Sequence, residues 1–244
     1  MAPKRHKKRC AAAALEDDPI ITDVDTDSDL EQHAVRLPPG LTLDMLPPAI
    51  PEQTASSLEQ ECQRQLFNQY IEMDVFQRLA KELDSDPLRP STLCRRGLTS
   101  KSFTVGAFYH AGTVGIRCNT KEHPWISALL AYMVRACTHM PFASVSLLCN
   151  VRMTAHRDKY NMEDTDNMVI PVSRFRQGQL WIEDDHGPDL SPAGKHRGRN
   201  HAVKLPGVQF DPCKLHATCP WKHDRIVLSA YTTKKIGDLK NQDK

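Results

Sequence analysis

The stretch NVRMTAHRDKYN, at residues 150–161, ends a run in which apolar and polar side chains alternate as in a β-strand. Alternate side chains of an extended strand share a face. One face of this run is apolar: Val145, Leu147, Cys149, Val151 and Met153. The other face is polar: Asn150, Arg152, Thr154, His156 and Asp158. A polar face is costly to bury unless it lines a cavity that satisfies it, so we expect a cavity with His156 and Asp158 at its mouth.

A His-x-Asp pair has two interpretations, a metal site or an ordinary turn with a local ion pair. A metal site needs a third ligand from a distant strand, and His216 lies 60 residues beyond His156. Two histidines and one carboxylate on one side of an ion form the facial triad of non-heme Fe(II) oxygenases. Arg225, nine residues beyond His216, opens the last predicted strand, and arginine binds carboxylates with two parallel hydrogen bonds.

The elements around this motif predict an α+β protein with helices ahead of a β-rich core. Apolar residues recur at helical spacing from Leu58 to Leu83, and Ser56 with Glu59 fits a capping box, so we expect one amphipathic helix there. A second helix is expected from Pro124 to about Thr138. Short apolar runs bounded by turn residues predict strands within residues 142–154, 167–173, 178–184, 201–207, 207–210 and 225–233. Strands at such close intervals indicate a β-sandwich or barrel.

The segments HRDKYN, VIPVSRFRQGQLWIED, LPGVQF and LHATCPWKHDRIVLSAYT, within residues 142–233, resemble the core of Fe(II)/2-oxoglutarate-dependent dioxygenases. They are most similar in character to the branch with the ten-eleven-translocation and base-J thymine oxygenases. Of the Gly-Gly pair typical of that branch, only Gly178 is retained, and Val227 stands where many members have serine or threonine. The resemblance implies a double-stranded β-helix (jelly-roll) core with flanking N-terminal helices.

The resemblance also implies the cofactors Fe(II) and 2-oxoglutarate and a role for each site residue. His156, Asp158 and His216 would hold the metal, and Arg225 would bind the far carboxylate of 2-oxoglutarate. Further hydrogen bonds to 2-oxoglutarate are expected from Asn150, Ser229 and Tyr231. Three more residues are expected to contact the substrate or to support the metal ligands: Arg152, Asn161 and Asn167.

Two other interpretations remain open. Cys213, His216, Cys219 and His223 have a C-x₂-H-x₂-C-x₃-H spacing that could close around structural zinc. The chain could also be a catalytically silent jelly roll that serves as a binding or mobile-element accessory module. If it is an enzyme, the expected substrate is a nucleic-acid base or a protein side chain. The basic segment at residues 194–201 could contact a phosphate backbone, which makes nucleic acid a possible partner.

The sequence divides into four expected regions. Residues 1–55 read as a disordered basic, acidic and proline-rich tail, residues 56–140 as a helical and mixed support region, residues 141–235 as the core, and residues 236–244 as a polar tail. The block PKRHKKR at residues 3–9 is typical of nuclear import or nucleic-acid contact, although the net charge of the chain is only +2. No apolar run approaches the ~18 residues of a membrane helix. Eight cysteines without a secretory signal indicate reduced thiols, so we expect an intracellular, nuclear protein of unassigned oligomeric state.

Overall fold

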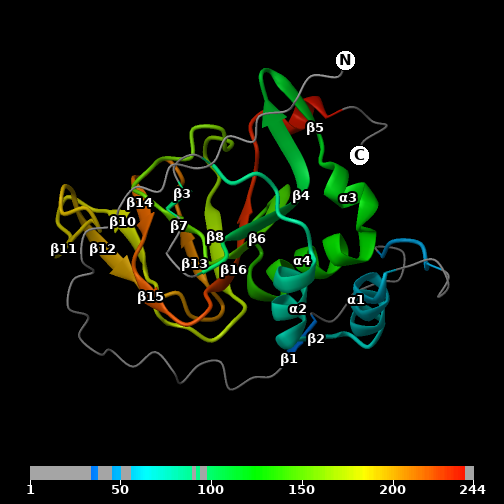
Figure 1. The fold of residues 1–244 in the computed structure, drawn as a ribbon. Helices are drawn as coiled ribbons and strands as arrows, with labels where there is room; N and C mark the ends of the chain where they lie inside the picture. Colours follow the sequence, from blue (N-terminus) through cyan, green and yellow to red (C-terminus); the bar gives the residue numbers. More distant parts are fainter. Residues whose placement is uncertain (1–33, 38–45, 51–55, 90–91, 94–97, 240–244) are drawn as a thin grey trace, which may run out of the picture.

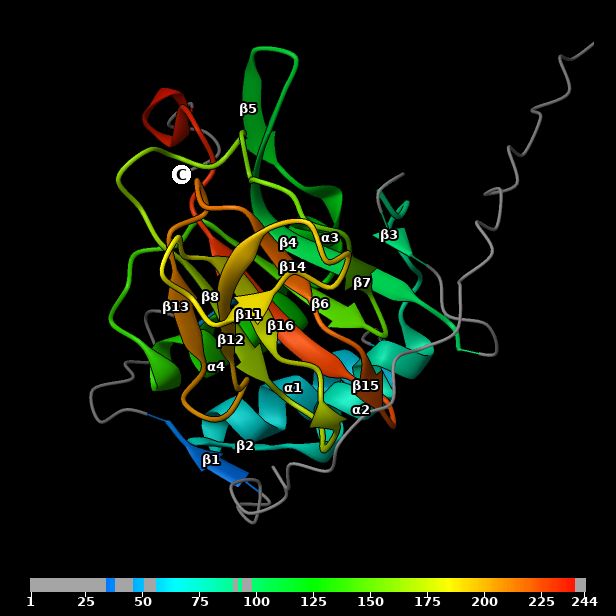
Figure 2. The ribbon, with the colours of Figure 1, turned by 90° about the vertical axis from the view of Figure 1, so that its left-hand side faces the viewer.

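The computed structural model describes residues 34–37, 46–50, 56–89, 92–93 and 98–239. Its largest sheet has six strands: β13 (Val208–Phe210), β8 (Asn167–Pro171), β16 (Ile226–Tyr231), β6 (Ser144–Cys149), β4 (Lys101–His110) and β5 (Thr113–Ile116), in that order. A smaller sheet has four: β11 (Asp189–Leu190), β12 (Arg197–His201), β10 (Leu180–Glu183) and β14 (His216–Thr218). Figure 1 shows the small sheet on one side of the large one, and Figure 2 shows it in front. The protein is therefore mostly β, as the sequence predicted for its second half.

Helices cover the other face of the large sheet (Figure 1). They are α1 (Ser57–Phe67), α2 (Asp74–Glu82) and α4 (Pro124–Cys137), with the short α3 (Cys118–Glu122) leading into α4. The main core lies between these helices and the large sheet, where side chains such as Trp125, Leu129, Leu147 and Leu228 are fully or almost fully buried. A second apolar cluster, with Val169, Leu180 and Phe210 among its members, joins the two sheets to each other. The two faces of the large sheet are thus buried against different partners.

The helix predicted from Pro124 is confirmed, but the single helix predicted from Leu58 to Leu83 is wrong. Gln69 adopts a left-handed φ of 56° just after α1, and Tyr70–Glu72 form a strand, β2, before α2 begins. The predicted cap is half right, since Ser56 Oγ accepts a hydrogen bond from Glu59 N at 3.2 Å. The Glu59 carboxylate instead accepts hydrogen bonds from backbone N–H groups at the start of α4.

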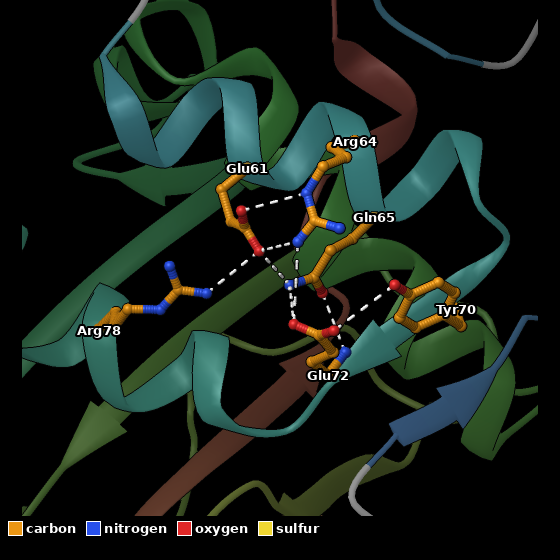
Figure 3. Close-up of polar contacts among 6 residues, drawn as sticks. All are labelled: Glu61, Arg64, Gln65, Tyr70, Glu72 and Arg78. Carbon is orange, nitrogen blue, oxygen red and sulfur yellow. Dashed lines mark hydrogen bonds and ion pairs between the residues drawn. The ribbon is translucent and has the colours of Figure 1, made fainter.

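A polar cluster between α1, α2 and β2 explains how the chain bends there (Figure 3). Gln65 accepts a hydrogen bond from the backbone N–H of Glu72 at 2.9 Å, and its own amide donates to Glu61 at 2.7 Å. Glu61 also forms ion pairs with Arg64 at 2.6 Å and with Arg78 at 3.1 Å. Hydrogen bonds to these donors lower the pKa of Glu61 to about 2, although burial opposes the shift. The carboxylate therefore stays charged and connects the two helices.

Two segments of the expected N-terminal tail are part of the fold. Ala34–Arg36 form β1, which pairs antiparallel with β2, and Leu37 is buried in the main core. Within residues 46–50, Ile50 N donates to Gln63 Oε1 and the Trp125 indole donates to Pro48 O. The expectation that all of residues 1–55 lie outside the fold is wrong for these segments. Residues 1–33, 38–45 and 51–55, including the basic block, lie outside the described residues.

Three further expectations need correction. The strand expected at residues 201–207 is wrong, because the strand in this region, β12, spans Arg197–His201 and ends where the expected one begins. The basic segment at residues 194–201 is therefore largely a strand. The strands β4 and β5 were not predicted at all, yet they extend the large sheet beyond β6. The expected C-terminal polar tail begins with a short 3-10 helix, η2 (Ile236–Asp238), and Leu239 is buried. Residues 240–244 lie outside the described residues.

Three short strand pairs complete the described structure: β1 with β2, β3 (Thr92–Leu93) with β7 (Arg152–Met153), and β9 (Arg176–Gln177) with β15 (Trp221–Lys222). Among the described residues, no helix is both long enough and apolar enough to cross a membrane.

Candidate metal and co-substrate site

His156, Asp158 and His216 come together at one cavity of about 270 Å³ between the two sheets. Each offers one ligand atom, and these atoms lie within 4.8 Å of one another. Asp158 Oδ1 is 3.6 Å from His156 Nε2, and Asp158 Oδ2 is 3.7 Å from His216 Nε2. The structure therefore assembles the three residues that the sequence singled out, and the set of two imidazoles and one carboxylate fits Fe(II).

Backbone pairing sets the distance between the two histidines. His156 follows β7, His216 begins β14, and the two residues are direct partners in an antiparallel bridge. His156 N donates to His216 O at 3.0 Å, and His216 N donates to His156 O at 2.9 Å. Their rings lie 4.3 Å apart between centroids. The 60-residue separation in sequence is thus closed by a single pair of hydrogen bonds.

Both imidazoles are oriented with Nε2 toward the carboxylate. The Nδ1 atoms lie 2.8 Å from Thr154 O and 2.9 Å from Lys214 O, positions in which Nδ1–H donates and Nε2 keeps its lone pair. Burial lowers the pKa of His216, and the neighbouring His156 lowers it further. The neutral form, which is the form that binds metals, is therefore favoured.

Asparagine side chains hold Asp158 in place. Asn167 Nδ2 donates to Asp158 Oδ2 at 2.9 Å, and Asn161 Nδ2 donates to Asn167 Oδ1 at 2.8 Å. Both asparagines are buried and line the cavity, as expected for residues that support the ligands. Arg89, which the sequence did not indicate, donates to Asp158 Oδ1 at 3.3 Å from the exposed rim. Its flanking residues have no periodic pattern that would have revealed it.

Arg225 lies directly before β16 and lines the same cavity. Arg225 is only 3% exposed. Its Nε donates to Gly178 O at 3.2 Å, and its guanidinium lies over the rings of Phe175 and Trp221. Burial lowers its pKa to about 10, so it remains a cation at neutral pH. Within the described part of the chain, no carboxylate forms an ion pair with it. A buried cation without a counter-ion is costly, and an anionic ligand in the cavity would supply one.

The alternation predicted for β16 is confirmed, since Val227, Ser229 and Tyr231 line the cavity together with Arg225. The alternation predicted across residues 145–158 is wrong beyond Cys149. Asn150 has a left-handed φ of 52°, which asparagine tolerates better than most residues, and the faces exchange there. Val151 and Met153 therefore line the cavity.

Asn150 and Arg152 consequently do not line the cavity, in contrast to their expected contacts with 2-oxoglutarate and substrate. Asn150 Oδ1 accepts from Arg225 N at 2.9 Å, and Asn150 Nδ2 donates to Asp224 Oδ1 at 2.8 Å. Its amide therefore positions the backbone of Arg225. Arg152 is half-buried on β7 and is not among the residues that line the cavity.

The zinc alternative gains no support. Within the described residues, His156, Asp158 and His216 are the one group of three or more His, Cys, Asp or Glu side chains close enough to share an ion. Cys213 is exposed, whereas Cys219 is buried and its thiol donates to Asn200 Oδ1 at 3.2 Å. Cys213, Cys219 and His223 do not converge on His216.

No family model and no curated protein matches the chain. Similar solved structures include a 2OG-Fe(II) oxygenase family protein from Burkholderia pseudomallei, at 12% identity and a TM-score of 0.40, covering 66% of this chain and 76% of that one. A Trichoplax adhaerens prolyl hydroxylase in complex with a hypoxia inducible factor peptide fragment has 14% identity and a TM-score of 0.32, covering 76% and 83%. A Pseudomonas putida prolyl-4-hydroxylase has 12% identity and a TM-score of 0.34, covering 73% and 85%. None of these three is named as a ten-eleven-translocation or base-J enzyme, so that branch assignment has no support. All three TM-scores are below 0.5.

Proposed function

We propose that this chain is an Fe(II)/2-oxoglutarate-dependent oxygenase that oxidises a nucleic-acid base or a protein side chain. One observation carries the proposal: a complete His-Asp-His ligand set and a buried arginine without a carboxylate partner line the same cavity. The first fits the metal, and the second fits the far carboxylate of a chelating diacid. The alternative is a catalytically silent jelly roll with the same binding site.

The strand order supports a double-stranded β-helix. From β6 onward the chain alternates between sheets: β6 and β8 lie in the large sheet, and the segment after β7 bridges to the small one through His156 and His216. The chain then runs through β10 and β12 in the small sheet, β13 in the large, β14 in the small and β16 in the large. Such alternation between two facing sheets is typical of jelly rolls.

The described residues would divide the work as follows. His156 and His216 would bind the metal through Nε2, and Asp158 through a carboxylate oxygen, with Asn167 holding that carboxylate in orientation. When bound, Fe(II) supplies open coordination positions and the redox chemistry that couples oxidative decarboxylation of 2-oxoglutarate to oxidation of a second substrate.

The co-substrate end of the cavity combines one fixed charge with apolar walls. Arg225 would bind the far carboxylate, and Ser229 and Tyr231, which line the same cavity, would offer hydroxyl groups to the bound ligands. Val227 is 1% exposed, and the apolar cluster that contains it closes the space between the sheets. Exclusion of water there would strengthen the charged contacts.

The test is an anaerobic titration of Fe(II) and 2-oxoglutarate that monitors the charge-transfer absorption of the chelate. We expect a band that requires both ligands, and Arg225→Met should raise the 2-oxoglutarate concentration needed by at least roughly tenfold. Arg135→Met is a matched control, because Arg135 lies on α4 over Phe142. Absence of the band in the wild-type protein would refute the proposal. A band without any succinate production in air would favour the silent alternative.

A further inference from the structure

Arg117 is a second arginine of the cavity that the proposed chemistry does not use. It follows β5, precedes α3, and lines the cavity. Its Nε is buried and has no hydrogen-bond partner among the described residues. Among the described residues no carboxylate forms an ion pair with Arg117, so its guanidinium is available to an anion in the cavity.

The carboxylates of the cavity are already engaged by other donors. Asp86 accepts from Thr104 N at 2.7 Å through Oδ2 and from Asn119 Nδ2 at 3.1 Å through Oδ1. Asp158 faces the two histidines, Asn167 and Arg89. Among the described residues, neither aspartate forms an ion pair with Arg117.

Arg117 and Arg225 lie three strands apart in the large sheet. Arg225 leads into β16, whereas Arg117 follows β5, and the strands β6 and β4 separate the two. Three strand spacings correspond to a backbone separation of about 14 Å. Between them, a row of hydroxyls crosses the sheet, because Ser229 pairs with Ser146 and Ser146 with Thr104 in register. We therefore assign the two guanidinium groups to different anions.

The charge of the cavity supports this assignment. Three arginines (Arg89, Arg117 and Arg225) and two aspartates (Asp86 and Asp158) line it, which leaves a formal surplus of one positive charge. A divalent metal and the 2-oxoglutarate dianion cancel each other, so the surplus persists after both have bound. It matches one additional anionic group.

We propose that Arg117 is a specificity-determining residue that binds an anionic oxyacid group, carboxylate or phosphate, of the substrate to be oxidised. This inference rests on the proposed function, since it takes Arg225 as the residue that binds 2-oxoglutarate. The hydroxyls of Thr104 and Ser146 line the same cavity as Arg117 and form a hydrogen bond with each other at 2.9 Å. They would offer the substrate a polar wall next to its charged end.

The test uses the Nε–Hε signals of arginine in ¹⁵N NMR spectra of the full chain. The protein is first loaded with Zn²⁺, a redox-inactive substitute for Fe(II), and then with 2-oxoglutarate, which should shift the Arg225 signal and leave Arg117 nearly unchanged. Inorganic phosphate and acetate are then titrated in separate arms. We expect a saturable shift of the Arg117 signal with one or both, and the stronger arm identifies the anionic group. The signal is assigned by its loss in Arg117→Lys.

Arg117→Met should weaken the effective probe by at least roughly tenfold, leave 2-oxoglutarate affinity unchanged and cause no loss of thermal stability, because the Nε has no partner to lose. The Arg135 signal serves as the control for nonspecific salt effects. An Arg117 signal that responds to neither probe, or a shift of Arg117 larger than that of Arg225 on adding 2-oxoglutarate, overturns the inference. If 2-oxoglutarate shifts neither arginine, the proposed function fails, while the phosphate and acetate arms still decide whether Arg117 binds an anion.

Discussion

Replacing Gly178 by alanine should damage the Arg225 contact specifically. Gly178 has a φ of +65°, and its carbonyl accepts the hydrogen bond from Arg225 Nε. A Cβ at this position would lie 3.0 Å from Arg225 Nε and 3.1 Å from Phe175 Cε2, so both side chains would have to move. The left-handed backbone alone costs a non-glycine residue roughly 1–2 kcal/mol, which corresponds to a fall in Tm of about 2–8 °C for a domain of this size.

A displaced guanidinium also loses part of its binding to a carboxylate. A hydrogen bond between charged groups contributes about 1.5–3 kcal/mol, and 1.4 kcal/mol is tenfold in affinity. Gly178→Ala should therefore weaken 2-oxoglutarate at least tenfold in the metal-loaded protein, as measured by calorimetric titration. Gly194→Ala is the matched control, because Gly194 has a φ of +70° with nothing within 4 Å of the added Cβ. It should lose comparable stability and keep its affinity. Equal 2-oxoglutarate affinities in the two variants would refute the reasoning.

Three other outcomes are expected. His156→Ala, Asp158→Ala and His216→Ala should each abolish iron-dependent turnover with the circular dichroism spectrum preserved; wild-type succinate production in any of them would contradict the ligand assignment. Glu59→Ala should lower the free energy of unfolding by about 2–4 kcal/mol, because the Glu59 carboxylate accepts the first N–H groups of α4, from Trp125 and Ile126, at 2.9 Å each; Glu59→Gln should cost less, and equal urea midpoints for both variants and wild type would disprove this. A chain that starts at residue 56 should have a lower Tm than one that starts at residue 34, because it lacks β1 and buried Leu37; identical melting curves would show that these contacts contribute nothing.

The sequence predicted the convergence of His156, Asp158 and His216 better than their surroundings, for identifiable physical reasons. The donor set is distinctive and its members lie at strand spacing: His156, Asp158, His216 and Arg225. Few other folded arrangements would account for that combination of residues. Alternation then failed beyond Cys149, because one left-handed residue, Asn150, exchanges the faces of a strand and composition does not show where that occurs.

The missed parts of the site lie in segments whose local pattern is ambiguous. The strand KSFTVGAFYH at Lys101–His110 alternates only from Ser102 to Ala107 and then has two consecutive aromatic residues, Phe108 and Tyr109, and it contains Gly106 with a φ of +91°. Thr104 and Arg117 therefore went unrecognised as cavity residues. The helical spacing continued by chance through residues 68–73, where the side chain of Gln65 bonds to a strand rather than to another helical turn.

The reciprocal bridge between His156 and His216 makes metal affinity a property of the folded chain. In the unfolded chain, a separation of 60 positions would keep the second imidazole at a low effective concentration, and only the local His-x-Asp pair would be available. A metal ion would then bind the native state far more tightly than the denatured ensemble. Linkage requires that such an ion stabilise the fold, by about 2.7 kcal/mol when its free concentration is a hundred times its dissociation constant. The apparent melting temperature would thus depend on the metal concentration, and chelators would act as denaturants in proportion to the metal they remove.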